Sequence, residues 1–193
     1  MAKDTLEIRW HGRGGQGAKT AATFLAEAVM AAGKHSQGFP EYGPERRGAP
    51  VRGYTRISEK PIRRHCSIAN PDIVIVLDPT LLDSPSAGVT QGTTKETIFL
   101  VNTTLSPEEI KKELGVEGAL FGAVDATGIA MDEFGRPIPN TPMVGALIKA
   151  SGILDMDTVA RVLEHKFGKK FSQKVIEGNL RAVKRAYEEL KTV

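Results

Sequence analysis

The chain has 193 residues, of which 40% are hydrophobic, a length and composition typical of one domain with an ordinary core. No apolar run approaches the roughly 18 residues that span a bilayer, and the first residues lack an apolar signal segment, so we expect a soluble cytoplasmic protein with no membrane contact. A modest net charge of +3, few aromatic residues and no recognition motif argue against nucleic acid as a partner.

Charge distribution and cysteine content narrow the functional classes further. Residues 41–66 carry seven bases and three acids, whereas residues 67–159 carry five bases and thirteen acids. Such zones suit docking to partners or to an anionic ligand. The single cysteine, Cys66, cannot form an internal disulfide, and alone it cannot hold zinc or an iron–sulfur cluster. Any redox metal that this protein serves is therefore expected on another chain.

The first third of the chain predicts strands around one helix. Residues 5–11 alternate apolar with polar side chains and predict a strand, and the alanine-rich residues 18–32 predict a helix. A short second strand is expected over 35–39. Residues 40–50 are dense in Gly and Pro, which excludes regular structure. The alternating run 51–58 predicts a strand that is exposed on one face and lies antiparallel at an edge of the sheet.

The middle of the chain predicts three buried strands. The continuous β-branched runs at 71–78 and 97–102 fit strands covered on both faces, as in a parallel sheet. Residues 106–115 carry the signals of a helix, with Ser at the cap, Pro and two acids in the first turn, and Gly at the end. Residues 119–127 predict the third strand.

The last third predicts helices over 140–151, 157–166 and 172–191, the last long and basic. Apolar strands that alternate with helices favour a three-layer α/β/α, Rossmann-like fold with a mostly parallel or mixed sheet. We expect one domain over residues 1–193, with a helical C-terminal segment from about residue 155 to 193.

Between the first strand and helix lies the stretch HGRGGQG, whose residues 12–17 satisfy the G-x-G-x-x-G pattern. Unpaired backbone N–H groups at such a junction, together with the helix dipole, form an anion site. Three uses stay open: a dinucleotide, another phosphate-bearing ligand, or a tight turn without a ligand. The dinucleotide is disfavoured because it requires an acid about 20 residues on; residues 34–39 contain none, and Glu41 lies beyond them.

A second irregular stretch, EYGPERRGAPVRG at 41–53, combines three glycines, two prolines and several arginines. Long irregular segments in compact domains are usually functional. Two interpretations stay open: a solvated basic loop, or a loop that docks on an anion or on another subunit.

Four motifs, taken in chain order, resemble one family. GRGGQGAKTAATFLAEAV, YGPERRGAP, PDIVIVLD and NTPMVGAL are similar to segments of the gamma subunit of pyruvate:ferredoxin oxidoreductase and related 2-oxoacid:acceptor oxidoreductases, and the resemblance runs from about residue 5 to 190. It implies an enzyme complex that converts a 2-oxoacid and coenzyme A to acyl-CoA, CO2 and reduced ferredoxin. Pyruvate is the first choice of substrate, with branched-chain 2-oxoacids and 2-oxoglutarate as runners-up.

The resemblance also implies how the cofactors and partners are distributed. Thiamine diphosphate, magnesium and the iron–sulfur clusters belong to the alpha, beta and delta subunits, and ferredoxin meets the complex rather than this chain. The chain is then a subunit without a complete active site; we assign no catalytic residue, and its four histidines, His11, His35, His65 and His165, are expected to be structural. The rival hypotheses are a free-standing NAD-binding dehydrogenase and a purely structural scaffold.

Two residue sets follow from these arguments. Binding of coenzyme A phosphates is predicted for Gly12, Arg13, Gly14, Gly15, Gln16, Gly17, Lys19 and Asn140. Contact with a partner subunit is predicted for Tyr42, Glu45, Arg46 and Arg47. No metal ligand is predicted on this chain.

Overall fold

A computed structural model describes residues 4–41, 48–168 and 171–193 of the chain. The strands are β1 (Thr5–Arg13), β2 (His35–Pro40), β3 (Pro50–Ser58), β4 (Ile73–Val76), β5 (Ile98–Asn102), β6 (Leu120–Val124) and β7 (Lys191–Thr192). The α-helices are α1 (Ala18–Ala31), α2 (Pro107–Leu114), α3 (Ala126–Phe134), α4 (Asn140–Ser151), α5 (Met156–Gly168) and α6 (Gln173–Glu189). Two short 3-10 helices follow β4, at Pro79–Leu81 and Pro85–Ala87.

The strands form one mixed seven-stranded sheet in the order β2-β3-β1-β4-β5-β6-β7. Strands β1, β4, β5 and β6 are parallel to their neighbours in this series, β3 is antiparallel to both β1 and β2, and β7 is antiparallel to β6. The parallel strands therefore all end at one edge of the sheet, the carboxyl edge. The predicted α/β class and the mixed, mostly parallel sheet are confirmed.

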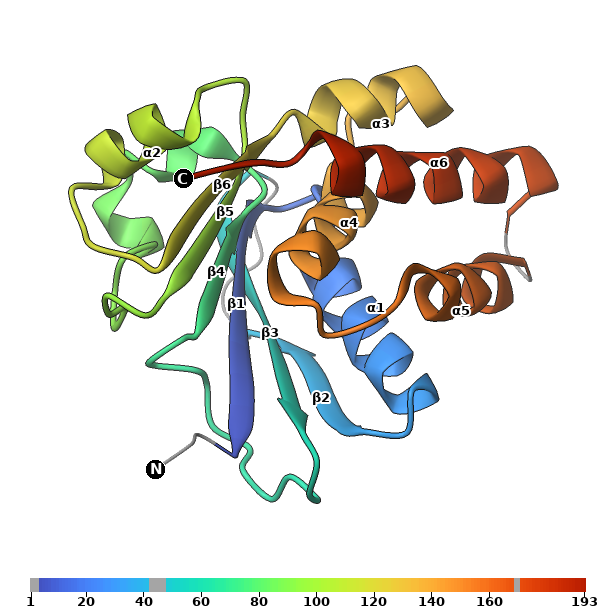
Figure 1. Ribbon diagram of the computed structural model, residues 1–193, viewed down its shortest axis with the longest axis horizontal. Helices are drawn as coiled ribbons and strands as arrows, with labels where there is room; N and C mark the ends of the chain where they lie inside the picture. The colour runs from blue at the N-terminus through green and yellow to red at the C-terminus, as the bar shows by residue number, and fades with distance from the viewer. Residues whose placement is uncertain (1–3, 42–47, 169–170) are drawn as a thin grey trace.

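Helices cover the two faces of the sheet unequally (Figure 1). On one side lie α1, α4, α5 and α6, over a core that includes Trp10, Leu25 and Leu147. On the other side lie α2 and the 3-10 helices, over a smaller core that contains the stacked rings of Phe99 and Phe121. This double covering explains why β4 and the first four residues of β5 are uninterrupted apolar runs.

The expectation for residues 51–58 is partly wrong. Strand β3 is antiparallel as predicted, but it lies between β1 and β2 and not at an edge. Its residues from Gly53 to Ser58 are buried, so it has no exposed face. Its polar side chains find buried partners: Thr55 Oγ1 accepts a hydrogen bond from Trp10 Nε1 at 3.1 Å, and Arg56 Nε lies 2.9 Å from Glu7 Oε1.

Two further expectations need correction. The strands are not apolar throughout, because β1 carries the buried side chains of Glu7, Arg9 and His11. The strand predicted over 119–127 ends at Val124, and Asp125 caps α3, accepting a hydrogen bond from Gly128 N at 2.8 Å. Helix α3 is not among the helices predicted from the sequence.

Candidate functional site

The glycine-rich stretch connects the carboxyl end of β1 to α1. Its first two residues remain in the strand, because Gly12 pairs with Val51 and Arg13 with Pro50. The turn follows: Gln16 N donates to Arg13 O at 3.0 Å, and Gly15 and Gly17 have φ of 103° and 85°. These positive angles are in the left-handed region that glycine adopts without a steric penalty.

The start of α1 presents unpaired backbone donors. Gly17 is the N-cap residue and supplies no side-chain cap, and the first turn contains no acid. Among the described residues, the first backbone hydrogen bond of the helix is donated by Ala21 N to Gly17 O at 2.9 Å. No described residue accepts a hydrogen bond from the N–H groups of Gly17, Ala18, Lys19 and Thr20, so these donors can bind an anion, and the helix dipole adds to their attraction.

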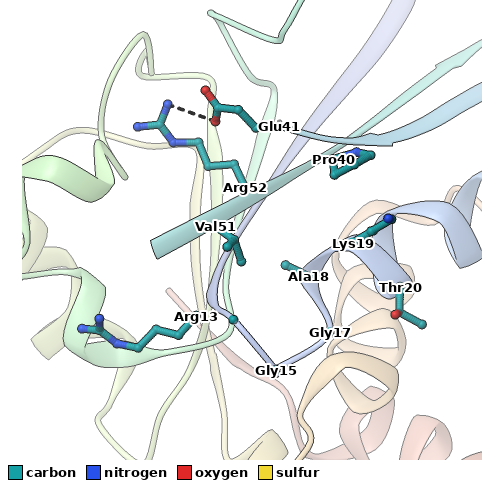
Figure 2. Close-up of a pocket in the computed structure, with 11 residues that line it drawn as sticks. Arg13, Gly15, Gly17, Ala18, Lys19, Thr20, Pro40, Glu41, Val51 and Arg52 are labelled. Atoms are coloured by element: carbon teal, nitrogen blue, oxygen red, sulfur yellow. Dashed lines mark ion pairs between the residues drawn. The ribbon is translucent and has the colours of Figure 1, made fainter. Parts of the chain in front are cut away.

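A cleft of about 560 Å³, here the glycine-loop cleft, opens beside these donors. Figure 2 shows the glycine loop and the first turn of α1 on one wall, and the end of β2 with the start of β3 on the other. The lining residues are Arg13, Gly14, Gly15, Gly17, Ala18, Lys19, Thr20, Pro40, Glu41, Val51 and Arg52. The predicted residues Arg13, Gly14, Gly15, Gly17 and Lys19 therefore meet in one place.

Lys19 contributes the available positive charge of the α1 wall. Its side chain is exposed, and it forms no ion pair with any described residue. A cation beside free backbone N–H groups favours phosphate over neutral ligands.

Arg13 is already engaged by neighbouring groups. Its Nε lies 3.3 Å from Asp78 Oδ2, its Nη2 donates to Thr80 Oγ1 at 2.7 Å, and its Nη1 donates to Gly48 O at 3.1 Å. The side chain accordingly points away from Lys19 and Thr20 (Figure 2). In this arrangement Arg13 holds the loop against the segment after β4.

Gln16 stabilises the glycine loop through hydrogen bonds of its side chain. It does not line the glycine-loop cleft. Its Oε1 accepts a hydrogen bond from Arg13 N at 2.7 Å, and its Nε2 donates to Asp78 Oδ2 at 2.6 Å. Burial disfavours ionisation of Asp78, but hydrogen bonds from Thr80 and Gln16 and the charge of Arg13 outweigh it and lower the pKa of this carboxyl. The ionised Asp78 thereby orders both loop residues.

Asn140 reaches the loop from the first residue of α4. A Cβ atom at Gly17 would lie 2.5 Å from Asn140 Nδ2, so the two residues are in direct contact. Asn140 Oδ1 accepts a hydrogen bond from Thr141 N at 2.7 Å. The side chain borders a small gap between α1 and α4, not the glycine-loop cleft. The structure thus brings Asn140 to the loop as a packing neighbour.

Glu41 and Arg52 form the opposite wall, and neither is among the site residues predicted from the sequence. Glu41 directly follows β2 and lines the cleft, although it had been set aside as too far along the chain. Its Oε2 lies 3.5 Å from Arg52 Nη1 and accepts a hydrogen bond from Tyr54 Oη at 2.9 Å. Burial, followed by this contact with Glu41, raises the pKa of Tyr54. An acid two residues after the predicted strand 35–39 was the available signal.

The remaining predicted residues do not line the glycine-loop cleft or lie outside the described part of the chain. Gly12 lies in β1, and a Cβ there would approach Leu77 and Ala18 at 3.3 and 3.4 Å, so this glycine permits close packing. Tyr42, Glu45, Arg46 and Arg47 lie outside the described residues.

His11 is buried and accepts a hydrogen bond on Nε2 from Arg9 Nε at 2.9 Å. Burial, assisted by the charges of Arg9 and Arg52, lowers the pKa of His11 to about 3. The imidazole is therefore neutral at physiological pH.

Over 4–41, 48–168 and 171–193, no group of three or more His, Cys, Asp or Glu side chains is placed to hold a metal ion. Within the same residues, every helix is too short or too polar to traverse a lipid bilayer.

Comparisons with known proteins agree with the motifs. Residues 7–189 match the family model described as pyruvate ferredoxin/flavodoxin oxidoreductase. The chain is 49% identical to pyruvate synthase subunit PorC of Thermotoga maritima, over 99% of this chain and 97% of the relative. It is 46% identical to the common gamma subunit of the pyruvate/ketoisovalerate oxidoreductases of Pyrococcus furiosus, over 95% and 96%.

A solved structure gives the same result in three dimensions. The crystal structure of pyruvate oxidoreductase subunit PORC from Thermotoga maritima superposes with a TM-score of 0.86 at 46% identity, covering 98% of this chain and 99% of that one. The resemblance inferred from the four motifs is confirmed, and the chain belongs to the pyruvate ferredoxin/flavodoxin oxidoreductase family.

Proposed function

We propose that this chain is the gamma subunit of a ferredoxin-dependent 2-oxoacid oxidoreductase and that its glycine-loop cleft binds phosphate groups of coenzyme A. The complex converts a 2-oxoacid, with pyruvate as first choice, to acyl-CoA, CO2 and reduced ferredoxin. The names of the relatives support the choice of pyruvate and also admit a branched-chain 2-oxoacid.

One observation carries the assignment of the ligand: free N–H groups at the start of α1, the exposed Lys19 and a cleft of about 560 Å³ meet at one point. The described part of the chain leaves room for a bulky anion, because a Cβ at Gly15 would have no described atom within 4 Å. A phosphate seated there would replace water on several donors and gain the attraction of the helix dipole.

Partner chains supply the rest of the chemistry. The single cysteine excludes a four-thiolate cluster on this chain, so the iron–sulfur centres, like thiamine diphosphate and magnesium, are assigned to the alpha, beta and delta subunits. The irregular stretch with Tyr42, Glu45, Arg46 and Arg47 is proposed as a contact with one of these subunits. If the chain has a purely structural role, substitutions in the glycine-loop cleft should not change the KM for coenzyme A.

The test uses the assembled enzyme with Lys19→Ala. Removal of one charge from a phosphate site weakens binding by about 1 kcal/mol, so the KM for coenzyme A should rise about three- to tenfold while the KM for the 2-oxoacid stays constant. Lys174→Ala is the matched control, because Lys174 is exposed on α6 and does not line the glycine-loop cleft. An unchanged KM for coenzyme A in the Lys19 variant would refute the assignment. Saturable NADH binding by the purified chain would instead favour a dehydrogenase.

A further inference from the structure

The segment between β3 and β4 lies at the edge of the sheet opposite the glycine-loop cleft. Ser58, the last residue of β3, pairs with Thr5 at the start of β1, and β4 begins at Ile73 beside Ile8. In Figure 1 this teal-to-green loop lies at the foot of the sheet, near the N-terminus. Residues 62–67, Ile-Arg-Arg-His-Cys-Ser, are here called the basic segment.

The basic segment has no regular secondary structure, yet side chains of the sheet hold both of its ends. Gln37 Nε2, from β2, donates to Ile62 O at 3.3 Å. Arg56, from β3, donates through Nη2 to Ser67 O at 3.3 Å and contacts Cys66 Sγ at 3.7 Å. The next residue, Ile68, is buried. The course of the segment is therefore fixed by contacts that start on neighbouring strands.

The contact through Arg56 is energetically costly. Arg56 is 1% exposed, and its Nη1 has no hydrogen-bond partner among the described residues. A buried polar donor without an acceptor costs about 1–3 kcal/mol, and a buried guanidinium is tolerated only with a counterion, which Glu7 provides. Local departures from optimal stability are expected where a surface has a function.

The basic segment presents three consecutive exposed side chains, Arg63, Arg64 and His65. Neither arginine forms an ion pair with a described residue, whereas the neighbouring Lys60 pairs with Asp4 at 3.4 Å. On α6, by contrast, Arg181 and Arg185 pair with acids of α3. The arginines of the basic segment thus form a positive strip, on a backbone held at both ends, that the described surface does not neutralise.

We propose that the basic segment docks on a carboxylate-rich surface of another subunit of the oxidoreductase complex. Guanidinium groups bind carboxylates in two-point geometry, and an already ordered backbone reduces the entropy that docking costs. Nucleic acid is the less suitable partner, because the segment offers only two guanidinium groups and no Phe, Tyr or Trp ring for stacking. The identification of the partner as a subunit of the oxidoreductase complex rests on the proposed function. The existence of the exposed positive surface does not depend on that function.

Cys66 provides the first test, because it is the single cysteine of the chain and is exposed within the basic segment. An uncharged maleimide is applied to the purified complex and to the separately purified chain, at low and at high salt, and alkylation of this chain is followed by mass spectrometry. We expect at least tenfold slower alkylation in the complex at low salt, with much of the difference lost at high salt. Equal rates in the complex and the separate chain would overturn the proposal.

Charge reversal provides the second test. The double variant Arg63→Glu, Arg64→Glu should bind its partner subunits at least tenfold more weakly in size-exclusion or pull-down measurements, and Arg63→Lys, Arg64→Lys should largely retain binding. Lys174→Glu is the matched control, since that lysine is exposed on α6 and has no ion pair within the described part of the chain.

The remaining outcomes are also decisive. If the double variant assembles normally and only the KM for ferredoxin rises, the basic segment serves the electron carrier and the assignment to a subunit is wrong. Loss of Cys66 protection on nuclease treatment would point to nucleic acid and would likewise overturn the proposal. A wild-type chain that copurifies with no partner chains would refute the proposed function and this docking surface together, whereas an intact complex with unprotected Cys66 would refute the docking surface alone.

Discussion

Gln16 and Asp78 are joined by a hydrogen bond of 2.6 Å from Nε2 to Oδ2, which connects the glycine loop to the segment after the neighbouring parallel strand. Gln16→Ala would remove one hydrogen bond from the Asp78 carboxylate and one from Arg13 N. We therefore expect a loss of about 1–2 kcal/mol in the free energy of unfolding. Gln16→Glu should cost more, because two carboxylates would then face each other, and its deficit should shrink as the pH falls. Urea denaturation measures both, with the exposed Gln173→Ala as control.

A second prediction separates backbone strain from steric contact in the glycine loop. Gly15→Ala introduces a Cβ into open space at φ 103°, so we expect only the left-handed penalty of about 1–2 kcal/mol. Gly17→Ala has φ 85° and also places its Cβ against Asn140, so it should destabilise the chain more than Gly15→Ala does. Adding Asn140→Ala should recover part of that excess in thermal or urea unfolding. Equal losses for the two alanine variants, with no recovery, would show that the loop relaxes freely around Gly17.

A third prediction concerns pH. His11 has a pKa of about 3 in the folded chain, below its ordinary value of 6.5, so the unfolded state binds the proton more tightly. The free energy of unfolding should therefore fall as the pH drops through the interval from 6.5 to 3, by about 1.4 kcal/mol per pH unit and about 2 kcal/mol by pH 5. His11→Gln should remove this part of the slope, as measured by urea denaturation at pH 7, 6 and 5. The exposed His165→Gln should leave it in place.

A fourth prediction concerns the buried pair Glu7 and Arg56. Glu7→Gln would leave the guanidinium buried without its counterion, and we expect a loss of about 3–5 kcal/mol. Joint replacement with Glu7→Leu and Arg56→Met should be much less damaging to global stability. The same double variant should nevertheless loosen the basic segment, which Arg56 holds at Ser67. Faster amide hydrogen exchange at residues 62–67 in an otherwise stable chain would show that the basic segment is loosened. Unchanged exchange would mean that the contacts of Gln37 and Ile68 are enough to hold the segment in place.

Elements whose signals are local were predictable from the sequence. Helix α2 begins and ends where its Ser106 cap and Gly115 indicate, and the capping box with Glu109 is present. Helix α4 has the predicted bounds, Asn140–Ser151. Capping residues act over three or four positions, so their effect is visible in a short stretch of sequence.

Features that depend on strand pairing were not predictable in the same way. The alternation in 51–58 predicts one exposed face, but Thr55 and Arg56 are polar because they bind buried partners on β1. Glu41 lies farther along the chain than the dinucleotide pattern expects of its acid. Only the order of the strands in the sheet brings it to the glycine-loop cleft. Gln16 matched a motif for ligand contact, whereas the structure turns its amide toward Asp78.

The insertion of β3 between β1 and β2 sets the distance between the glycine loop and Glu41. Neighbouring strands lie about 4.8 Å apart, so an acid at the end of β2 stands about 10 Å across the sheet from β1, twice its distance in a sheet where the two strands adjoin. A nucleotide that places its phosphate on the loop and its ribose on an adjacent strand would fall short of Glu41. If a ligand of the cleft contacts both the glycine loop and Glu41, it must therefore be more extended than the part of a dinucleotide that spans two adjoining strands.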